Sequence, residues 1–192
     1  MCNACVPVTR DDKSVDEFAD QLLNMLNQGA LSLMVSIGHR TGLFDAMAEL
    51  SSITIAELAT HCGLDERYVK EWLGAMVTGD IVIYEPGSGV YHLPETHAAL
   101  LTRSSAPDNI AVFAQYISVL GQVEDRIVEC FRNGGGVGYE HYPRFHQVMA
   151  EDSGQTVLAA LDEHILPLID HRLADLERCL LYTSDAADDE TS

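Results

Sequence analysis

The chain has 192 residues, a formal net charge of −19 and a hydrophobic content of 47%. A surface this acidic repels the phosphates of nucleic acids, because affinity for DNA rests on Lys and Arg side chains that displace counterions, so we expect no nucleic-acid partner. No apolar run reaches the roughly 18–20 residues that a membrane-spanning helix needs, so we expect no membrane partner either.

The N-terminal residues and the cysteines favour a cytoplasmic protein. The segment Met1–Lys13 lacks the apolar core of a secretion signal. The five cysteines are scattered, unlike those of a secreted disulfide scaffold. Cys2 and Cys5 form a C-x-x-C pair, but no second pair completes a zinc site. We therefore expect a disordered N-terminus over residues 1–14 and no bound metal.

The first elements in chain order are helices. Residues 15–28 carry apolar side chains at helical spacing, and Ser14 with Glu17 forms a capping box at the start. Gly29 is predicted to separate this helix from a second one over residues 30–39. A short third helix is expected at 44–50.

The next segment has the pattern of a helix-turn-helix. Thr54 and Asp65 are suited to cap two helices, at 55–61 and 66–78. Gly63 lies in the turn between them, where a positive φ is required. A helix, a glycine turn and a second helix together predict a helix-turn-helix.

Two strand-forming stretches, 81–84 and 90–93, follow the helix-turn-helix and predict a β-hairpin, hence a winged helix. Between Thr54 and Pro94 acidic residues outnumber basic ones by six to two. A winged helix that reads DNA needs basic residues on its second helix and wing. We therefore favour a packing or dimerisation module. A winged-helix regulator or adaptor, complete as it stands, is the alternative.

The rest of the chain is predicted to be helical, with a boundary near Pro107 and a break at the glycine cluster 133–138. The predicted helices are 94–101, 109–132, 143–152 and 155–169. The expected fold class is mainly α. A winged helix-turn-helix domain with a small β-hairpin wing spans residues 15–107, and a helical connector spans 108–178.

No pattern of an independent catalytic site is present. The cluster Gly134–Gly138 follows a helix instead of a strand and lacks the lysine of a P-loop, so a hinge is expected there. The eight histidines form no metal-ligand pattern, and no nucleophile elbow occurs. We name no catalytic residue and expect no reaction from this chain alone.

The last residues, 179–192, have a foreign character. The DNA string TGTCTCTTATACACATCTGACGCTGCCGAC, which reads like a transposase sequencing adapter, encodes the segment Cys179–Asp188 in one frame. Such scars are set aside before reasoning about a fold. The expectation is that residues 179–192 are an adapter artefact and that the natural protein continues beyond Arg178.

Three strings in the chain carry a resemblance to a known family. They are ALSLMVSIGHRTGLF at 30–44, GLDERYVKEWLGAMVTG at 63–79 and MAEDSGQT at 149–156. Together they resemble the N-terminal region of bacterial, actinobacterial-type class I S-adenosylmethionine-dependent methyltransferases that begin with a winged helix. Plant O-methyltransferases share this architecture. The resemblance covers residues 14–170.

The resemblance implies different roles for the winged helix and for a second domain. In this family the winged helix serves dimerisation and roofs the substrate pocket, and a following Rossmann-like domain holds S-adenosylmethionine. That domain opens with a V-L-D-x-G-x-G turn, which this chain does not reach. The resemblance therefore implies a homodimeric, cytoplasmic parent enzyme with a small-molecule acceptor. The fragment itself is expected to bind no cofactor and to be inactive.

Five residues are assigned to the pocket of the parent enzyme by the same resemblance. A Phe-x-x-x-Met-x-x-x-Ser pattern lines the donor and acceptor pocket in plant relatives, and Phe145, Met149 and Ser153 match its spacing. Phe113 and Tyr116 are expected on the acceptor side. From periodicity alone, the first three residues share one helix face that ordinary packing also explains.

Overall fold

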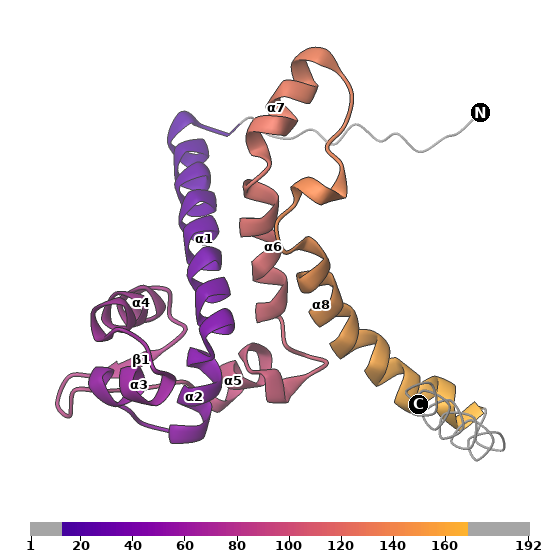
Figure 1. Ribbon diagram of the computed structural model, residues 1–192. Helices are drawn as coiled ribbons and strands as arrows, with labels where there is room; N and C mark the ends of the chain where they lie inside the picture. The colour runs from indigo at the N-terminus through magenta and orange to yellow at the C-terminus, as the bar shows by residue number, and fades with distance from the viewer. Residues whose placement is uncertain (1–12, 169–192) are drawn as a thin grey trace, which may run out of the picture.

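The computed structural model describes residues 13–168. The predictions for the N-terminus, for Cys2 and Cys5 and for residues 179–192 therefore fall outside the described residues. The described part is mostly helical, with one two-stranded antiparallel hairpin (Figure 1). This confirms the predicted fold class. No helix between residues 13 and 168 is both long enough and apolar enough to cross a membrane.

The first helix, α1 (Val15–Thr41), begins at the predicted capping box. The Ser14 hydroxyl accepts a hydrogen bond from the backbone N–H of Glu17 at 3.3 Å, and the Ser14 backbone N–H donates to the Glu17 carboxylate at 2.8 Å. The predicted break at Gly29 is wrong, because α1 continues through it. A single glycine costs an exposed helix only about 1 kcal/mol, too little to outweigh the helical residues on both sides.

Three shorter helices complete the helix-turn-helix: α2 (Leu43–Leu50), α3 (Ile55–Cys62) and α4 (Glu66–Thr78). The caps are those predicted from the sequence. The Thr54 hydroxyl and the Asp65 carboxylate accept hydrogen bonds from backbone N–H groups in the first turns of α3 and α4. Gly63 ends α3 with φ of 64°, a conformation that costs glycine little.

The wing is the hairpin of β1 (Ile83–Glu85) and β2 (Val90–His92). Its strands are antiparallel, with Tyr84 opposite Tyr91, and these two rings lie 4.6 Å apart. A single bridge joins Ile53 to Tyr91 and ties the wing to the segment before α3. The predicted hairpin is thus confirmed, although its strands are shorter than expected.

Trp72 of α4 lies at the centre of the core. Its ring meets Phe44 edge-on with centroids 5.2 Å apart, and its indole N–H donates to the backbone oxygen of Met34 at 2.9 Å. Gly38 of α1 lies directly against both rings. The two rings pack on each other, so neither can move away to make room for a side chain at position 38. The packing of α1 on α4 therefore depends on glycine at this position.

After the wing come α5 (Glu95–Leu101), the 3₁₀ turn η1 (Arg103–Ser105), α6 (Ala111–Gly121) and α7 (Glu124–Asn133). The predicted single helix over 109–132 is wrong. The chain leaves helical geometry at Val123, where φ is −110° and ψ is 8°. The Val123 side chain is only 1% exposed. Burial of Val123, two residues after the weak helix former Gly121, therefore accompanies the break.

The last described elements are the 3₁₀ turn η2 (Tyr139–His141), α8 (Phe145–Ala160) and the π-helical turn η3 (Leu161–Ile165). The predicted division into helices at 143–152 and 155–169 is wrong, because α8 runs through Gly154. No heavy atom outside its own helix lies within 4 Å of the Cβ position of this glycine. As at Gly29, one glycine does not end a helix whose neighbours favour it.

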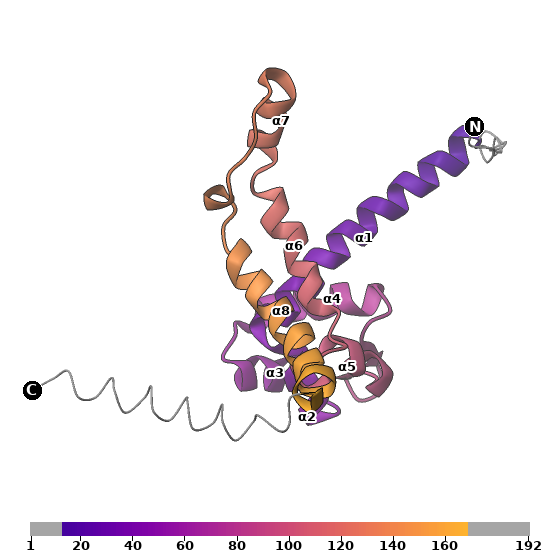
Figure 2. The same cartoon turned by 90° about the vertical axis from the view of Figure 1, so that its right-hand side faces the viewer.

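Helix α1 makes its most extensive contacts with α6, and α6 in turn packs against α8. Figure 2 shows α1 leaving the body of the protein at its N-terminal half, and α7 extending away on its own. Every residue from 13 to 28 is exposed. About half of the longest described helix is therefore largely uncovered within residues 13–168.

We predict opposite effects of two glycine substitutions in α1. A Cβ atom on Gly38 would lie 2.5 Å from the Trp72 ring and 2.8 Å from the Phe44 ring, whereas one on Gly29 meets no atom within 4 Å. Overpacking should make Gly38→Ala less stable by about 1–3 kcal/mol. Helix propensity should make Gly29→Ala more stable by up to about 1 kcal/mol. Urea unfolding monitored by Trp72 fluorescence measures both; equal effects would contradict this account of the core.

Candidate functional site

Helix α8 carries two different faces, and the candidate site is built around it. One face is aromatic and open, and begins at Phe145. The other face is polar and carries Glu151, which points toward α1 and α6. Residues at spacings of four share a helix face, so Phe145 and Met149 lie on a different side of α8 from Glu151.

Aromatic rings surround Phe145 at the start of α8. The Tyr139 ring stacks on it at 5.4 Å, the Tyr142 ring is tilted at 5.7 Å, and the Tyr116 ring of α6 meets it edge-on at 6.2 Å. Aromatic pairs at these separations add roughly 0.5–1.5 kcal/mol each beyond the area they bury. The structure thus brings together two residues that the sequence assigned to the pocket, Phe145 and Tyr116.

Tyr116 is held in place by α8. Its hydroxyl donates to the Asp152 carboxylate at 3.1 Å. Burial raises the pKa of Tyr116, and the hydrogen bond and negative charge of Asp152 raise it further, so the phenol stays protonated near neutral pH. Its position therefore suits a fixed hydrogen-bonding wall and not a general base.

The other predicted pocket residues are more scattered. Met149 is 41% exposed, and Ser153 lies exposed one turn further along α8. Phe113, 43% exposed, lines instead an apolar groove of about 380 Å³ between α1 and α6. The pocket-lining role predicted for all five residues remains a prediction. Their positions form an open surface on α8 and α6, with Phe113 on a separate side.

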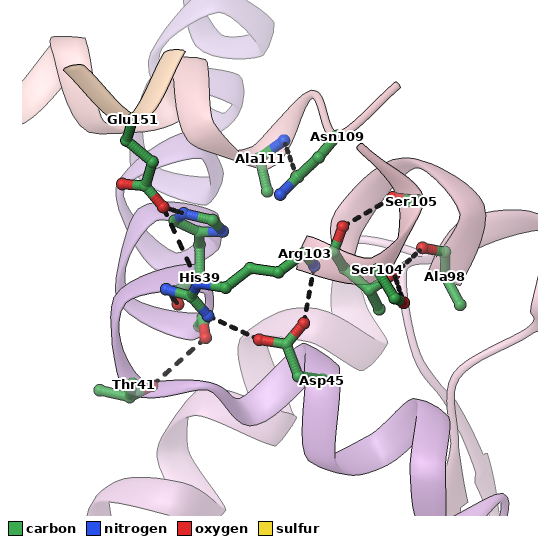
Figure 3. A network of polar contacts seen from close by, with 12 residues as sticks. His39, Thr41, Asp45, Ala98, Arg103, Ser104, Ser105, Asn109, Ala111 and Glu151 are labelled. Atoms are coloured by element: carbon green, nitrogen blue, oxygen red, sulfur yellow. Dashed lines mark hydrogen bonds and ion pairs between the residues drawn. The ribbon is translucent and has the colours of Figure 1, made fainter. Parts of the chain in front are cut away.

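The polar face of α8 is joined to α1 by a hydrogen bond between His39 and Glu151 (Figure 3). The His39 Nε2 atom lies 2.7 Å from a Glu151 carboxylate oxygen, and His39 is only 1% exposed. Because a carboxylate only accepts hydrogen bonds, Nε2 must be the donor. The His39 Nδ1 atom is buried without a partner among the described residues. The bond to Glu151 is therefore the polar contact of this ring.

Arg103 joins the end of α1 to α2. Its guanidinium pairs with the Asp45 carboxylate at 2.6 Å and donates to the His39 backbone oxygen at 2.7 Å, while its backbone N–H donates to Asp45 at 2.7 Å (Figure 3). A positive charge is favourable where the last carbonyls of a helix are unpaired. Arg103 thus acts as a side-chain cap for the C-terminus of α1.

Gln115 of α6 extends the network on the other side. Its side-chain N–H donates to the second oxygen of Glu151 at 2.8 Å, and its amide oxygen accepts from Arg144 at 2.7 Å. Burial disfavours the charge on Glu151, but the hydrogen bonds from Gln115 and His39, with the charges of His39 and Arg103, outweigh it and lower the pKa of the carboxyl. Glu151 is therefore ionised near neutral pH and holds three helices together.

No pattern in the sequence predicts this network. His39 and Glu151 are 112 positions apart, and no local motif links them. Both lie inside strings that carry the family resemblance, which is the one signal that could have drawn attention to them.

No group of three or more metal-ligating side chains occurs within residues 13–168. Cys62 and Cys130 are free thiols, and burial, with the Asp45 charge, raises the pKa of Cys62, so that its reactive thiolate is disfavoured. The described site thus consists of an aromatic surface and a structural ion-pair network.

Comparison with known proteins gives a family for the first part of the chain. Residues 29–103 match the model of the Rv2258c-like winged HTH domain. The match begins inside α1 and ends in η1, so it contains the whole helix-turn-helix and the wing. No curated protein matches the chain.

Three solved structures show how far the fold is shared. N,N-8-amino-8-demethyl-D-riboflavin dimethyltransferase from Streptomyces davawensis has 18% identity and a TM-score of 0.57, and the match covers 77% of this chain and 46% of that one. Human N-acetylserotonin methyltransferase in complex with S-adenosylmethionine has 18% identity and a TM-score of 0.56, with 76% of this chain and 44% of that one covered. Mitomycin 7-O-methyltransferase has 15% identity and a TM-score of 0.56, with 75% of this chain and 46% of that one covered. The chain spans less than half the length of each. At these identities the likeness concerns the fold.

We predict that the Glu151 network stabilises the fold in a pH-dependent manner. Because folding lowers the pKa of Glu151 below its usual value of 4.5, its contribution is present above that value and is lost as the pH falls through the folded-state pKa. At pH 7, Glu151→Gln should cost about 1 kcal/mol, since the side chain is partly exposed.

Urea unfolding between pH 7 and pH 3 measures this contribution, and the difference between wild type and Glu151→Gln should narrow as the pH falls. Glu71→Gln, at an exposed position of α4, is the matched control and should change stability little at any pH. A constant Glu151→Gln effect over this range would show that the carboxylate charge is not the cause.

Proposed function

We propose that this chain, which carries an Rv2258c-like winged HTH domain at residues 29–103, is the N-terminal part of a cytoplasmic S-adenosylmethionine-dependent methyltransferase that acts on a small molecule. The observation that carries the proposal is the extent of the shared fold. The likeness to the three methyltransferases covers 75–77% of this chain, well beyond residues 29–103. It therefore extends beyond the winged helix, a module that by itself occurs in proteins of many functions.

In this proposal the aromatic face of α8 is one wall of the reaction site, and Phe145, Met149 and Ser153 face the methyl donor. S-adenosylmethionine, when bound, supplies an electrophilic methyl group on a positively charged sulfur. Aromatic faces attract cations, and Met side chains adapt to irregular apolar ligands, so the open surface around Phe145 fits such a wall. Tyr116, held by Asp152, would orient the acceptor from the α6 side, and Phe113 would add apolar surface.

The described residues provide neither a donor cradle nor a general base at this wall. The chemistry is therefore assigned to a following Rossmann-like domain, and this chain alone is proposed to be inactive. Its part in methyl transfer is to exclude water and to hold the acceptor in line with the donor methyl, which are positioning effects.

The charge on the helix-turn-helix supports a role other than reading DNA. On α4, Arg67 and Lys70 are accompanied by Glu66 and Glu71. In the wing, Glu85 ends β1, and the turn over residues 86–89 has no basic residue. Phosphate contacts require basic side chains at these two places. The winged helix is therefore proposed to serve packing and dimerisation.

The proposal predicts that the reading frame continues beyond Arg178 into a strand and a V-L-D-x-G-x-G turn. Sequencing the source locus across codon 178 with adapter-free reads tests this. Protein made from the extended frame should bind S-adenosylmethionine in calorimetry, whereas the 192-residue chain should not. A stop codon directly after Ser192 would contradict the proposal.

In the extended protein, Met149→Ala should weaken donor or acceptor binding about tenfold, which is the usual effect of removing a few apolar atoms from a ligand pocket. Leu158→Ala is the matched control, because Leu158 is equally apolar and 58% exposed but lies on the other side of α8. Unchanged KM values for both substrates in Met149→Ala would exclude Met149 from the pocket.

The exposed half of α1 is proposed to pair with a second copy of the chain. A stripe of exposed apolar residues follows one face of the helix; its members are Val15, Phe18, Leu22, Met25, Leu26, Leu33 and Ile37. An isolated helix of about this length is marginal in water, so the stripe needs cover. A two-fold axis would place the same stripe of the partner against it.

We predict that Leu22→Glu and Leu26→Glu each weaken this dimer at least tenfold, because like charges would face each other across the axis. Asn24→Glu adds the same charge on the opposite side of α1, next to α4, and should leave the dimer intact. Sedimentation velocity over a range of concentrations measures the effect. A wild-type chain that stays monomeric at every concentration would refute the pairing.

A further inference from the structure

A polar cavity of about 290 Å³ lies where α1, α6 and α8 meet. It is lined by Arg40, Arg103, Gln115, Arg144, Gln147 and Glu151. Three arginines thus face one cavity in a chain that has 11 basic and 30 acidic residues. In so acidic a protein, such a gathering of positive charge needs a physical explanation.

Two of these arginines have no carboxylate partner within residues 13–168. Arg103 is neutralised by Asp45. Within the same residues, Arg144 donates to the side-chain oxygens of Gln115, at 2.7 Å, and Gln147, at 3.4 Å. Arg40 forms no ion pair or side-chain hydrogen bond with any residue that the structure describes.

The charge of Arg40 also acts on Arg144. Burial lowers the pKa of Arg144, and the neighbouring charge of Arg40 lowers it further, against the opposing effect of Glu151. Like charges that are held together in a partly desolvated place cost free energy, and an anion between them removes that cost.

Glu151 does not fill this role, although it lines the same cavity. One of its oxygens receives the His39 bond at 2.7 Å, and the other receives the Gln115 bond at 2.8 Å. Its nearest arginine contact is to Arg103, at the longer distance of 3.8 Å. The carboxylate is thus directed to α1 and α6, which leaves Arg40 and Arg144 without an anion.

The backbone at the start of α8 also favours a bound anion. Arg144 is the residue before the helix and takes the left-handed conformation with φ of 61°, which is strained for a side chain other than glycine. No side chain caps α8 at this end. The Phe145 amide donates to the Tyr142 backbone oxygen at 3.3 Å, and the remaining amides of a first helical turn attract anions.

We propose that this cavity binds the oxyanion group, carboxylate or phosphate, of a small molecule between Arg40 and Arg144. Guanidinium groups bind both oxyanions through paired hydrogen bonds. The volume suits an anionic group or a small metabolite, near the lower end of ligand pockets. The site lies on the side of α8 away from Phe145 and Met149, so it stands apart from the proposed methyl-transfer wall.

The test uses the ¹⁵N-labelled 192-residue chain in two nuclear magnetic resonance titrations, one with inorganic phosphate and one with malonate, at ionic strength held constant with chloride. Saturable shifts of the Arg144, Phe145, His146 and Gln147 amides are expected with at least one of the two anions. Saturation by phosphate or by malonate alone identifies the oxyanion that is preferred. Shifts that do not saturate with either anion would overturn the proposal.

Two variants and a matched control locate the site. Arg40→Gln and Arg144→Gln should each weaken binding about tenfold, the usual effect of losing one charge-assisted contact. Arg67→Gln removes an exposed arginine of α4 and should leave binding unchanged. Equal weakening in all three would reveal unspecific charge attraction and overturn the proposal. The proposal would also be overturned if wild type bound neither anion and Arg40→Gln were less stable than wild type without added anion. A carboxylate of the chain itself would then occupy the cavity.

Discussion

The arrangement of the helices depends on one carboxylate. Glu151 of α8 accepts from His39 of α1 and from Gln115 of α6, and these bonds cross the junction of the winged helix and the connector. A buried polar group that loses its partner costs about 1–3 kcal/mol, so the His39 ring fixes where α8 can lie. The direction of the aromatic face of α8 follows from this constraint, since turning Glu151 inward turns Phe145 outward.

Two surfaces, on the N-terminal half of α1 and on α8, are left open by this arrangement of the helices. The polar network and the Trp72 core hold only the C-terminal half of α1, so the N-terminal half leaves the body as an uncovered amphipathic helix (Figure 2). The aromatic surface on α8 is also open: α6 packs against this helix, yet Met149 remains 41% exposed. Both surfaces are of the kind that proteins cover with a partner or a further domain.

Local signals in the sequence predicted the local structure well. The capping box at Ser14, the cap at Thr54 and the turn at Gly63 depend on residues a few positions apart, and the structure contains all of them. The errors came from predicting helix breaks near Gly29 and Gly154 and from missing the break at Val123. One glycine costs too little to end a helix whose neighbours favour it, and the break at Val123 accompanies burial, which a local pattern does not contain. The Glu151 network joins residues from distant parts of the chain, so spacing alone could not predict it.

The distance along the chain between His39 and Glu151 also has a consequence for biosynthesis. Closing a loop of 112 residues costs chain entropy that is recovered only when α8 has been made. Synthesis runs from the N-terminus, so the helix-turn-helix and its wing leave the ribosome long before Glu151 does. During that interval the imidazole of His39 is still open to water, and the nascent domain must rely on Trp72 and Phe44 to keep its shape. When α8 is complete, its Glu151 binds His39 and joins α8 to the unit that has already folded.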